Sequence, residues 1–161
     1  MTAPEGGMDP SIVKLAEPHG VRSCKEGGQW EQCRESATFA AEQAAIKQVS
    51  RSEMDFRLLR REIASRMAAA MEGRLIFGDR ADVSKTRRSD YVLELRFDQR
   101  LQYPNEVRAV RLYFSEPDVL PQTMLIAKLA AKPASREGLD MQDDHIDEAD
   151  LRVRKHFGII G

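Results

Sequence analysis

Apolar and polar residues alternate along residues 91–100, which read YVLELRFDQR. One side of this segment holds Tyr91, Leu93, Leu95 and Phe97. The other side holds Val92, Glu94, Arg96 and Asp98. A period of two is typical of a β-strand with one buried face and one face in water. We therefore expect a charged face, the side that carries Arg96, which is open for contacts outside the chain.

Two further strands are expected at residues 107–114 and 123–130. Their connections, QRLQYPNE and SEPDVLPQ, are short and rich in Pro, Asn and Asp, which favours an antiparallel meander. Residues 11–16, SIVKLA, are a candidate for an additional strand, and residues 21–32 are expected to be loop.

Three helices are expected from apolar residues that recur three and four positions apart. The first begins at Ser36 in SATFAAEQAAIKQV. The second begins at SRSE, residues 50–53, which fits a capping box with Ser50 as the cap, and it runs to about Glu72 before Gly73. The last begins at about Asp144. Its apolar positions are Ile146, Ala149, Val153 and Phe157.

This order of elements predicts an α+β fold. We expect a small antiparallel or mixed sheet of three to four strands, packed against two N-terminal helices, with a C-terminal helix. The chain has 161 residues, of which 42% are hydrophobic, which suits one domain with its own core. We expect that domain over residues 11–161 and a disordered tail over residues 1–10.

Composition points to a cytoplasmic protein without metal or cofactor. No apolar run approaches the roughly 20 residues of a membrane helix, so no contact with a membrane is expected. The first residues, MTAPEGGMDPS, have neither the basic start nor the apolar core of a secretory signal. Cys24 and Cys33 form no CxxC pair and have no fourth ligand beside His19, so we expect free thiols and no metal site.

Charge is unevenly distributed along the chain. Residues 51–112 carry fourteen Lys or Arg against ten Asp or Glu, whereas residues 113–150 carry three against nine. Two interpretations remain open: an evenly solvated surface, or a basic working face screened by an acidic segment.

Symmetric hairpins would fix which residues meet on the charged face. Arg96 would lie opposite Ala109, and Ala109 opposite Lys128, so that two cations about 10 Å apart flank one small residue and leave room for a phosphate backbone. In the same register Glu94 faces Arg111 and Val92 faces Tyr113. Arg111 either neutralises Glu94 or contacts a ligand, and both alternatives stay open.

The segments YVLELRF, VRAVRLYF, TMLIAKLAAKP and HIDEADLRVRKHF, in this order, resemble the RelE/HigB-like toxins of type II toxin-antitoxin modules, in the RelE/ParE superfamily. The resemblance covers residues 54–157. It implies a small toxin that enters the ribosome and cuts mRNA without a metal, with a cognate antitoxin as partner. In such a reaction a ribose 2′-hydroxyl attacks the adjacent phosphate, so the enzyme needs proton-transfer groups and cations that stabilise the phosphorane.

Carried over by position, the resemblance implies the site residues. The candidate catalytic residues are Arg96, Arg111, Lys128, Lys132 and, for proton transfer, His156. The candidate RNA-binding residues are the loop cations Lys85, Arg87 and Arg88, with Tyr113 as a stacking platform. Each has a structural alternative: Tyr113 could pack across strands, and His156 could favour a helix end.

Three functions remain open at this point. The first is a ribosome-dependent mRNA endoribonuclease, the second is a toxin of the same fold that poisons gyrase, and the third is a protein-interaction module without catalytic activity. Fold alone does not decide between them.

Overall fold

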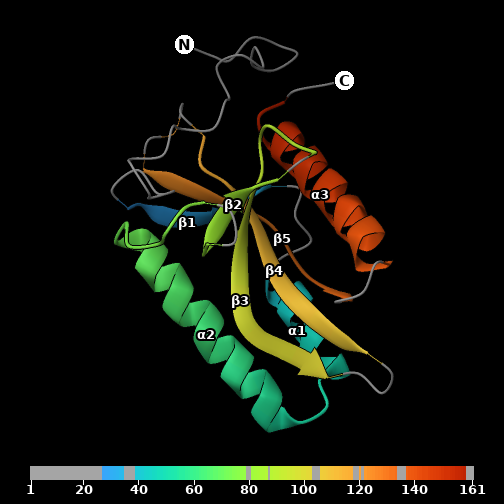
Figure 1. The fold of residues 1–161 in the computed structure, drawn as a ribbon. Coiled ribbons are helices and arrows are strands. Elements are labelled where there is room, and N and C mark those ends of the chain that lie inside the picture. Colours follow the sequence, from blue (N-terminus) through green and yellow to red (C-terminus); the bar gives the residue numbers. More distant parts are fainter. Residues whose placement is uncertain are drawn as a thin grey trace.

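The structure is a computed structural model. It describes residues 27–34, 39–78, 81–86, 88–102, 106–117, 120, 122–133 and 137–158. These ranges contain five strands and three helices, which are labelled in Figure 1. The strands are β1 (Gln29–Gln32), β2 (Val83–Lys85), β3 (Leu93–Gln102), β4 (Val107–Ser115) and β5 (Thr123–Pro133). The helices are α1 (Phe39–Val49), α2 (Glu53–Met71) and α3 (Glu137–His156).

The strands form one mixed sheet in the order β1-β5-β4-β3-β2. β1 pairs with β5 in parallel, and the remaining pairs are antiparallel. The expected α+β fold is thus confirmed, and so is the meander of three strands. The sheet has five strands rather than three or four, because residues 29–32 and 83–85, expected to be loop, are strands.

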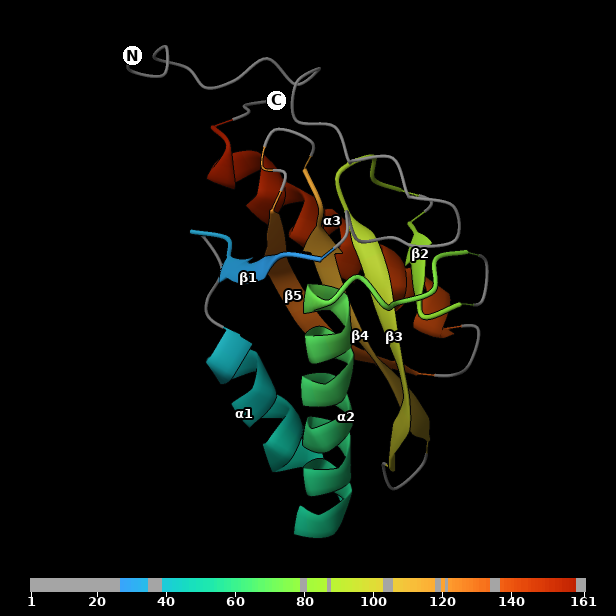
Figure 2. The same cartoon turned by 90° about the vertical axis from the view of Figure 1, so that its left-hand side faces the viewer.

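Helices cover both faces of the sheet (Figures 1 and 2). α1 and α2 pack on one face, and their core includes Phe56, Leu59 and Ile63 against Leu95 and Leu112. α3 packs on the other face, where Ile146, Ala149 and Val153 meet a second cluster of buried strand residues. The sequence predicted that the whole charged face is open. The structure differs, because α3 covers the part of this face that β4 and β5 form.

The strand register differs from the expected one by two to four residues. Arg96 lies opposite Arg111 rather than Ala109, and Tyr113 lies opposite Lys128. Shifts of register between Arg96 and Arg100, and between Tyr113 and Phe114, make the hairpins asymmetric. Between β3 and β4 every displacement is even, so Glu94, Arg96 and Arg111 keep the face that the alternation assigned to them, whereas Asp98 pairs with Arg66 on the α2 side.

The helix boundaries follow from their caps. Ser52, not Ser50, caps α2: its hydroxyl accepts a hydrogen bond from the Asp55 amide at 3.1 Å. Gly73 ends this helix with a left-handed φ of 69°, as expected.

α3 begins at Glu137, two turns before the expected Asp144. Gly138 makes this possible, because a Cβ at this position would lie 1.8 Å from the carbonyl oxygen of Pro133. Within the described residues, no helix combines the length and apolar character that crossing a membrane requires. The tail at residues 1–10, the strand candidate at 11–16, Cys24 and His19 lie outside the described residues.

Candidate functional site

Four cations gather on the charged face where α3 does not cover it. Arg96 of β3 lies opposite Arg111 of β4. Two residues before Arg111 on β4, Ala109 lies between Arg100 of β3 and Lys132 of β5. Adjacent strands are about 4.8 Å apart, so the backbones of Arg100 and Lys132 are about 10 Å apart with only one methyl group between them. We call Arg96, Arg100, Arg111 and Lys132 the cation cluster.

One carboxylate lies inside the cation cluster. Glu94 is buried, and its Oε1 lies 2.6 Å from Nε of Arg111 and 3.6 Å from Nε of Arg96. Its Oε2 accepts a hydrogen bond from the Gln142 amide at 2.9 Å, and Oε1 of Gln142 accepts one from Nζ of Lys132 at 2.8 Å. The pairing of Arg111 with Glu94, one of the two alternatives left open by the sequence, is therefore present, and the same carboxylate also contacts Arg96 and reaches Lys132 through Gln142.

The pKa of Lys132 is lowered in these surroundings. Burial lowers the pKa of its ammonium group, and the positive charge of Arg111 lowers it further. Arg96 and Arg100 act in the same direction, whereas Glu94 opposes them. A lysine whose pKa is lowered in this way is a better proton donor, and a fraction of it becomes a base nearer to neutral pH.

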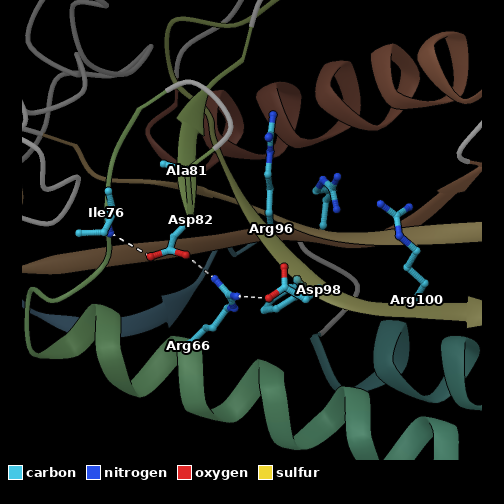
Figure 3. A pocket seen from close by; sticks show the side chains of 9 residues that line it. Arg66, Ile76, Ala81, Asp82, Arg96, Asp98 and Arg100 are labelled. Carbon is cyan, nitrogen blue, oxygen red and sulfur yellow. Dashed lines mark hydrogen bonds and ion pairs between the residues drawn. The ribbon is translucent and has the colours of Figure 1, made fainter.

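A cavity of about 350 Å³ adjoins the cation cluster and is bordered by Arg96, Arg100 and Arg111 (Figure 3). On its α2 side, Arg66 donates to Asp82 at 2.5 Å and to Asp98 at 2.9 Å. Arg96 and Arg100 extend from β3 away from α2. Since Asp82 and Asp98 already hold Arg66, they do not neutralise the arginines of the cluster.

A second hollow of about 170 Å³ lies between β2, β3 and the beginning of α3. Its lining includes Lys85, Arg96, Leu139 and Gln142. Arg96 borders both hollows, which lie along β3. We call the two hollows together the β3 groove. The predicted RNA-binding residue Lys85 lies in it.

Lys128 lies elsewhere, in an ion-pair network. Its Nζ is 2.8 Å from Glu148 of α3 and 3.6 Å from Glu42 of α1. Arg152 binds the same two carboxylates. Lys128 therefore joins helices to β5, and the expectation that it contacts a ligand together with Arg96 does not fit its position.

Tyr113 is fully buried beneath α3. Burial raises the pKa of its phenol, and the neighbouring charge of Glu94 adds to the rise. A side chain in this position packs across strands and does not offer a stacking surface to a base.

The remaining candidates are spread around α3. Nδ1 of His156 accepts a hydrogen bond from the Arg34 amide at 3.1 Å, and burial, followed by the charge of Arg34, lowers its pKa. Fourteen residues separate His156 from Gln142, which is about 21 Å along a helix, so His156 is remote from the cation cluster. Arg88 forms a two-pronged contact with Asp147 at 2.9 and 2.6 Å. Arg87 lies outside the described residues.

Sequence reasoning missed Arg100, Arg66 and Gln142. Arg100 could have been found, because Leu101 continues the alternation of Leu95 and Phe97 and places Arg100 beside Arg96. Arg66 and Gln142 reach the site from helices, and no spacing within one element indicates such a meeting.

The site can bind a polyanion. The cation cluster supplies fixed guanidinium groups and one titratable ammonium group, the set that a phosphodiester with developing charge requires. Among the described residues, no group of three or more His, Cys, Asp or Glu is placed to hold a metal ion.

Comparisons of the chain with protein-family models, with curated proteins and with solved structures give no match. The resemblance to RelE/HigB-like toxins therefore rests on the four sequence segments alone.

Proposed function

We propose that the protein binds single-stranded RNA in the β3 groove and cleaves it, as a cytoplasmic, ribosome-dependent mRNA endoribonuclease of the RelE/HigB toxin type. The observation that carries this proposal is the cation cluster, in which four cations of three neighbouring strands share one face and one buried carboxylate pairs with two of them. An electropositive groove that follows the strand is the usual means of binding RNA regardless of sequence. The ribosome and its mRNA are the proposed substrate complex, and a cognate antitoxin is the proposed inhibitor.

The cluster distributes the chemical roles as follows. Arg96 and Arg111 hold the reacting phosphate, and Arg100 holds its neighbour. The 2′-hydroxyl gives up its proton to solvent water as it attacks phosphorus, the bond from phosphorus to the 5′-oxygen breaks, and a cyclic phosphate and a 5′-hydroxyl result. Lys132 protonates the leaving 5′-oxygen, which is supported by the lowered pKa of its ammonium group. His156 has no role in this scheme, since it lies at the far end of α3.

Mapping of new mRNA 5′ ends in a translating bacterial extract tests the proposal. The full chain is compared with Arg96→Ala/Arg100→Ala and with the control Arg51→Ala/Arg60→Ala, which removes the same charge from exposed positions. We expect new ends within codons for the full chain and the control, and a loss of about 100-fold or more for the cluster variant. No new ends with any of the three proteins would refute the nuclease proposal, and so would equal cleavage by all three.

A non-catalytic binding module is the second candidate. It is favoured by the positions of His156 and Tyr113, because two of the predicted catalytic or stacking groups do not reach the groove. Such a module would bind RNA through the cation cluster but would produce no new ends. Induction in growing bacteria separates the candidates further: arrest with mRNA cleavage indicates the nuclease, arrest with DNA breaks a gyrase poison, and normal growth a module.

A further inference from the structure

The outward face of α2 carries a row of residues that the core does not use. Met54, Leu58, Arg61, Ser65 and Ala69 follow one another at spacings of three and four along this helix. Met54 and Leu58 are 57% and 42% exposed. Spacings of three and four place residues on one stripe, the pattern by which two helices pack together. In Figure 2 this helix lies at the front of the molecule, on the side of the sheet opposite α3.

The stripe borders a hollow of about 540 Å³, whose lining includes Leu58, Arg61, Ser65 and Ala69 of α2 together with Glu62, Arg66 and Asp82. We call it the α2 groove. The small side chains of Ser65 and Ala69 lie in its middle. Small residues allow the backbone of a second helix to approach closely, and Leu58 at one end offers apolar contact.

In this region the carboxylates have partners within the chain, whereas two exposed arginines have no ion-pair partner among the described residues. Glu62 accepts hydrogen bonds from the amides of Asp98 and Gln99, and Asp82 holds Arg66. These carboxylates are therefore satisfied within the chain. Arg57 and Arg61 are exposed, and neither makes an ion pair within the part of the chain that the structure describes. A partner that docks here would meet unneutralised guanidinium groups beside exposed apolar side chains.

We propose that the α2 groove binds an acidic amphipathic helix of a partner protein. Leucine-like side chains of that helix would pack on Met54, Leu58 and Ala69, and its flanking carboxylates would pair with Arg57 and Arg61. Exposed methionine and leucine in the stripe favour a protein helix over RNA, whose phosphates make no use of apolar area. The proposal does not rest on the RNA-cleaving function, because the cation cluster lies on the opposite face of the sheet, although Arg66 and Asp82 border both the α2 groove and the cavity beside the cluster.

A designed peptide serves as the probe. It is a fluorescein-labelled helix of about 20 residues, above the length at which isolated helices are marginal, with leucine at alternating spacings of three and four and glutamate at the flanking positions. A scrambled peptide of the same composition and a version with lysine in place of glutamate are the controls. Fluorescence anisotropy with the full chain measures the affinity.

Two charge-reversed variants of the protein locate the binding. Arg57→Glu/Arg61→Glu changes the α2 groove, and Arg51→Glu/Arg60→Glu makes the same change of net charge outside it. We expect the first variant to bind the acidic peptide about ten-fold more weakly or worse and to prefer the lysine peptide, and the second to lose less than about three-fold. Ser65→Trp, which fills the groove at an exposed position without a change of charge, is expected to abolish binding.

Three results would overturn the proposal: no binding of the acidic peptide to the unaltered chain, equal losses in the two charge-reversed variants, or displacement of the bound peptide by single-stranded RNA. The last result would assign the face to nucleic acid. Circular dichroism and unfolding midpoints of each variant confirm that a loss of binding is not a loss of folding.

Discussion

Gly138 allows the first turn of α3 to lie directly against the end of β5. A Cβ at this position would be 1.8 Å from the Pro133 carbonyl oxygen, a backbone atom that cannot rotate away. We predict that Gly138→Ala lowers the free energy of unfolding by about 1–2 kcal/mol. The clash outweighs the gain of up to about 1 kcal/mol that alanine brings inside a helix.

Urea unfolding measures this effect, with Asp144→Ala as the control, since Asp144 is exposed on the same helix. The control is expected to stay within about 0.5 kcal/mol of the unaltered chain. A stabilised Gly138→Ala protein would mean that α3 does not approach β5 this closely.

His145 makes the stability of the fold depend on pH. Burial lowers its pKa to about 4, and the charge of Lys128 adds to this. Between pH 6.5 and 4 the unfolded chain takes up a proton that the folded chain does not, so stability falls as the pH falls through this window. We predict a loss of about 1–2 kcal/mol, reduced from the full value because the ring is partly exposed.

Nuclear magnetic resonance titration of the His145 ring checks the midpoint, and His145→Gln identifies the signal. Urea unfolding at pH 7 and pH 4.5 should then show a smaller difference for His145→Gln than for the unaltered chain. A midpoint near the ordinary 6.5 would contradict the prediction.

Part of the site could be predicted residue by residue. The alternation of apolar and polar residues correctly placed Glu94, Arg96 and Arg111 on one face, because a period of two survives any even displacement of a strand. The partner of Arg96 could not be predicted, since the register depends on irregularities within the hairpins that leave no mark in the sequence. Lys128 was misjudged because its partners, Glu42 and Glu148, come from helices distant in sequence.

At the scale of the secondary-structure element, the side chain of Glu62 covers an exposed edge of β3. β2 pairs only with Leu93, Glu94 and Leu95 of β3. Beyond them the amides of Asp98 and Gln99 would be left without partners, and the two carboxylate oxygens of Glu62 accept from them at 2.7 and 2.8 Å. Side chains that satisfy an exposed strand edge also discourage pairing with other chains.

We predict that Glu62→Gln lowers the free energy of unfolding by about 1–3 kcal/mol, because an amide offers one acceptor oxygen where two are needed. Hydrogen exchange at Asp98 and Gln99 should accelerate by about ten-fold or more. Glu53→Gln makes the same chemical change in the exposed first turn of α2 and should leave both amides unaffected. Unchanged exchange in Glu62→Gln would show that these amides have other partners.

The elements that sequence reasoning missed are the shortest. β1 has four residues and β2 has three, too few for an alternation to be distinguished from chance. α3 was expected to begin at Asp144 because its apolar stripe begins at Ile146. Its first two turns carry Gly138 and several acidic residues, a composition typical of a loop. The long helix α2 and the three long strands could be predicted because each repeats its period several times.

At the scale of the whole molecule, the acidic segment lies against the basic one. α3 carries most of the negative charge of residues 113–150, and it packs on the charged face of the sheet. Arg88 pairs with Asp147, and Lys128 pairs with Glu148. Of the two interpretations of the charge distribution, the structure therefore favours the basic face with an acidic neighbour. Where α3 covers the charged face, Lys128 is neutralised by Glu148 of that helix, whereas the cation cluster lies on the uncovered part.

This arrangement gives a last prediction, which rests on the proposed binding of RNA in the β3 groove. Asp140 and Asp144 are exposed on the first half of α3, whose Leu139 and Gln142 line that groove. Their charges repel a phosphate backbone over about 10 Å at 0.1 M salt. We predict that Asp140→Asn/Asp144→Asn binds a single-stranded RNA about two- to five-fold more tightly at low salt, and that the gain disappears at high salt.

Glu31→Gln/Glu53→Gln removes the same charge from exposed positions on β1 and α2. If this control gains as much as the α3 variant, the effect reflects net charge alone, and RNA does not pass beside α3.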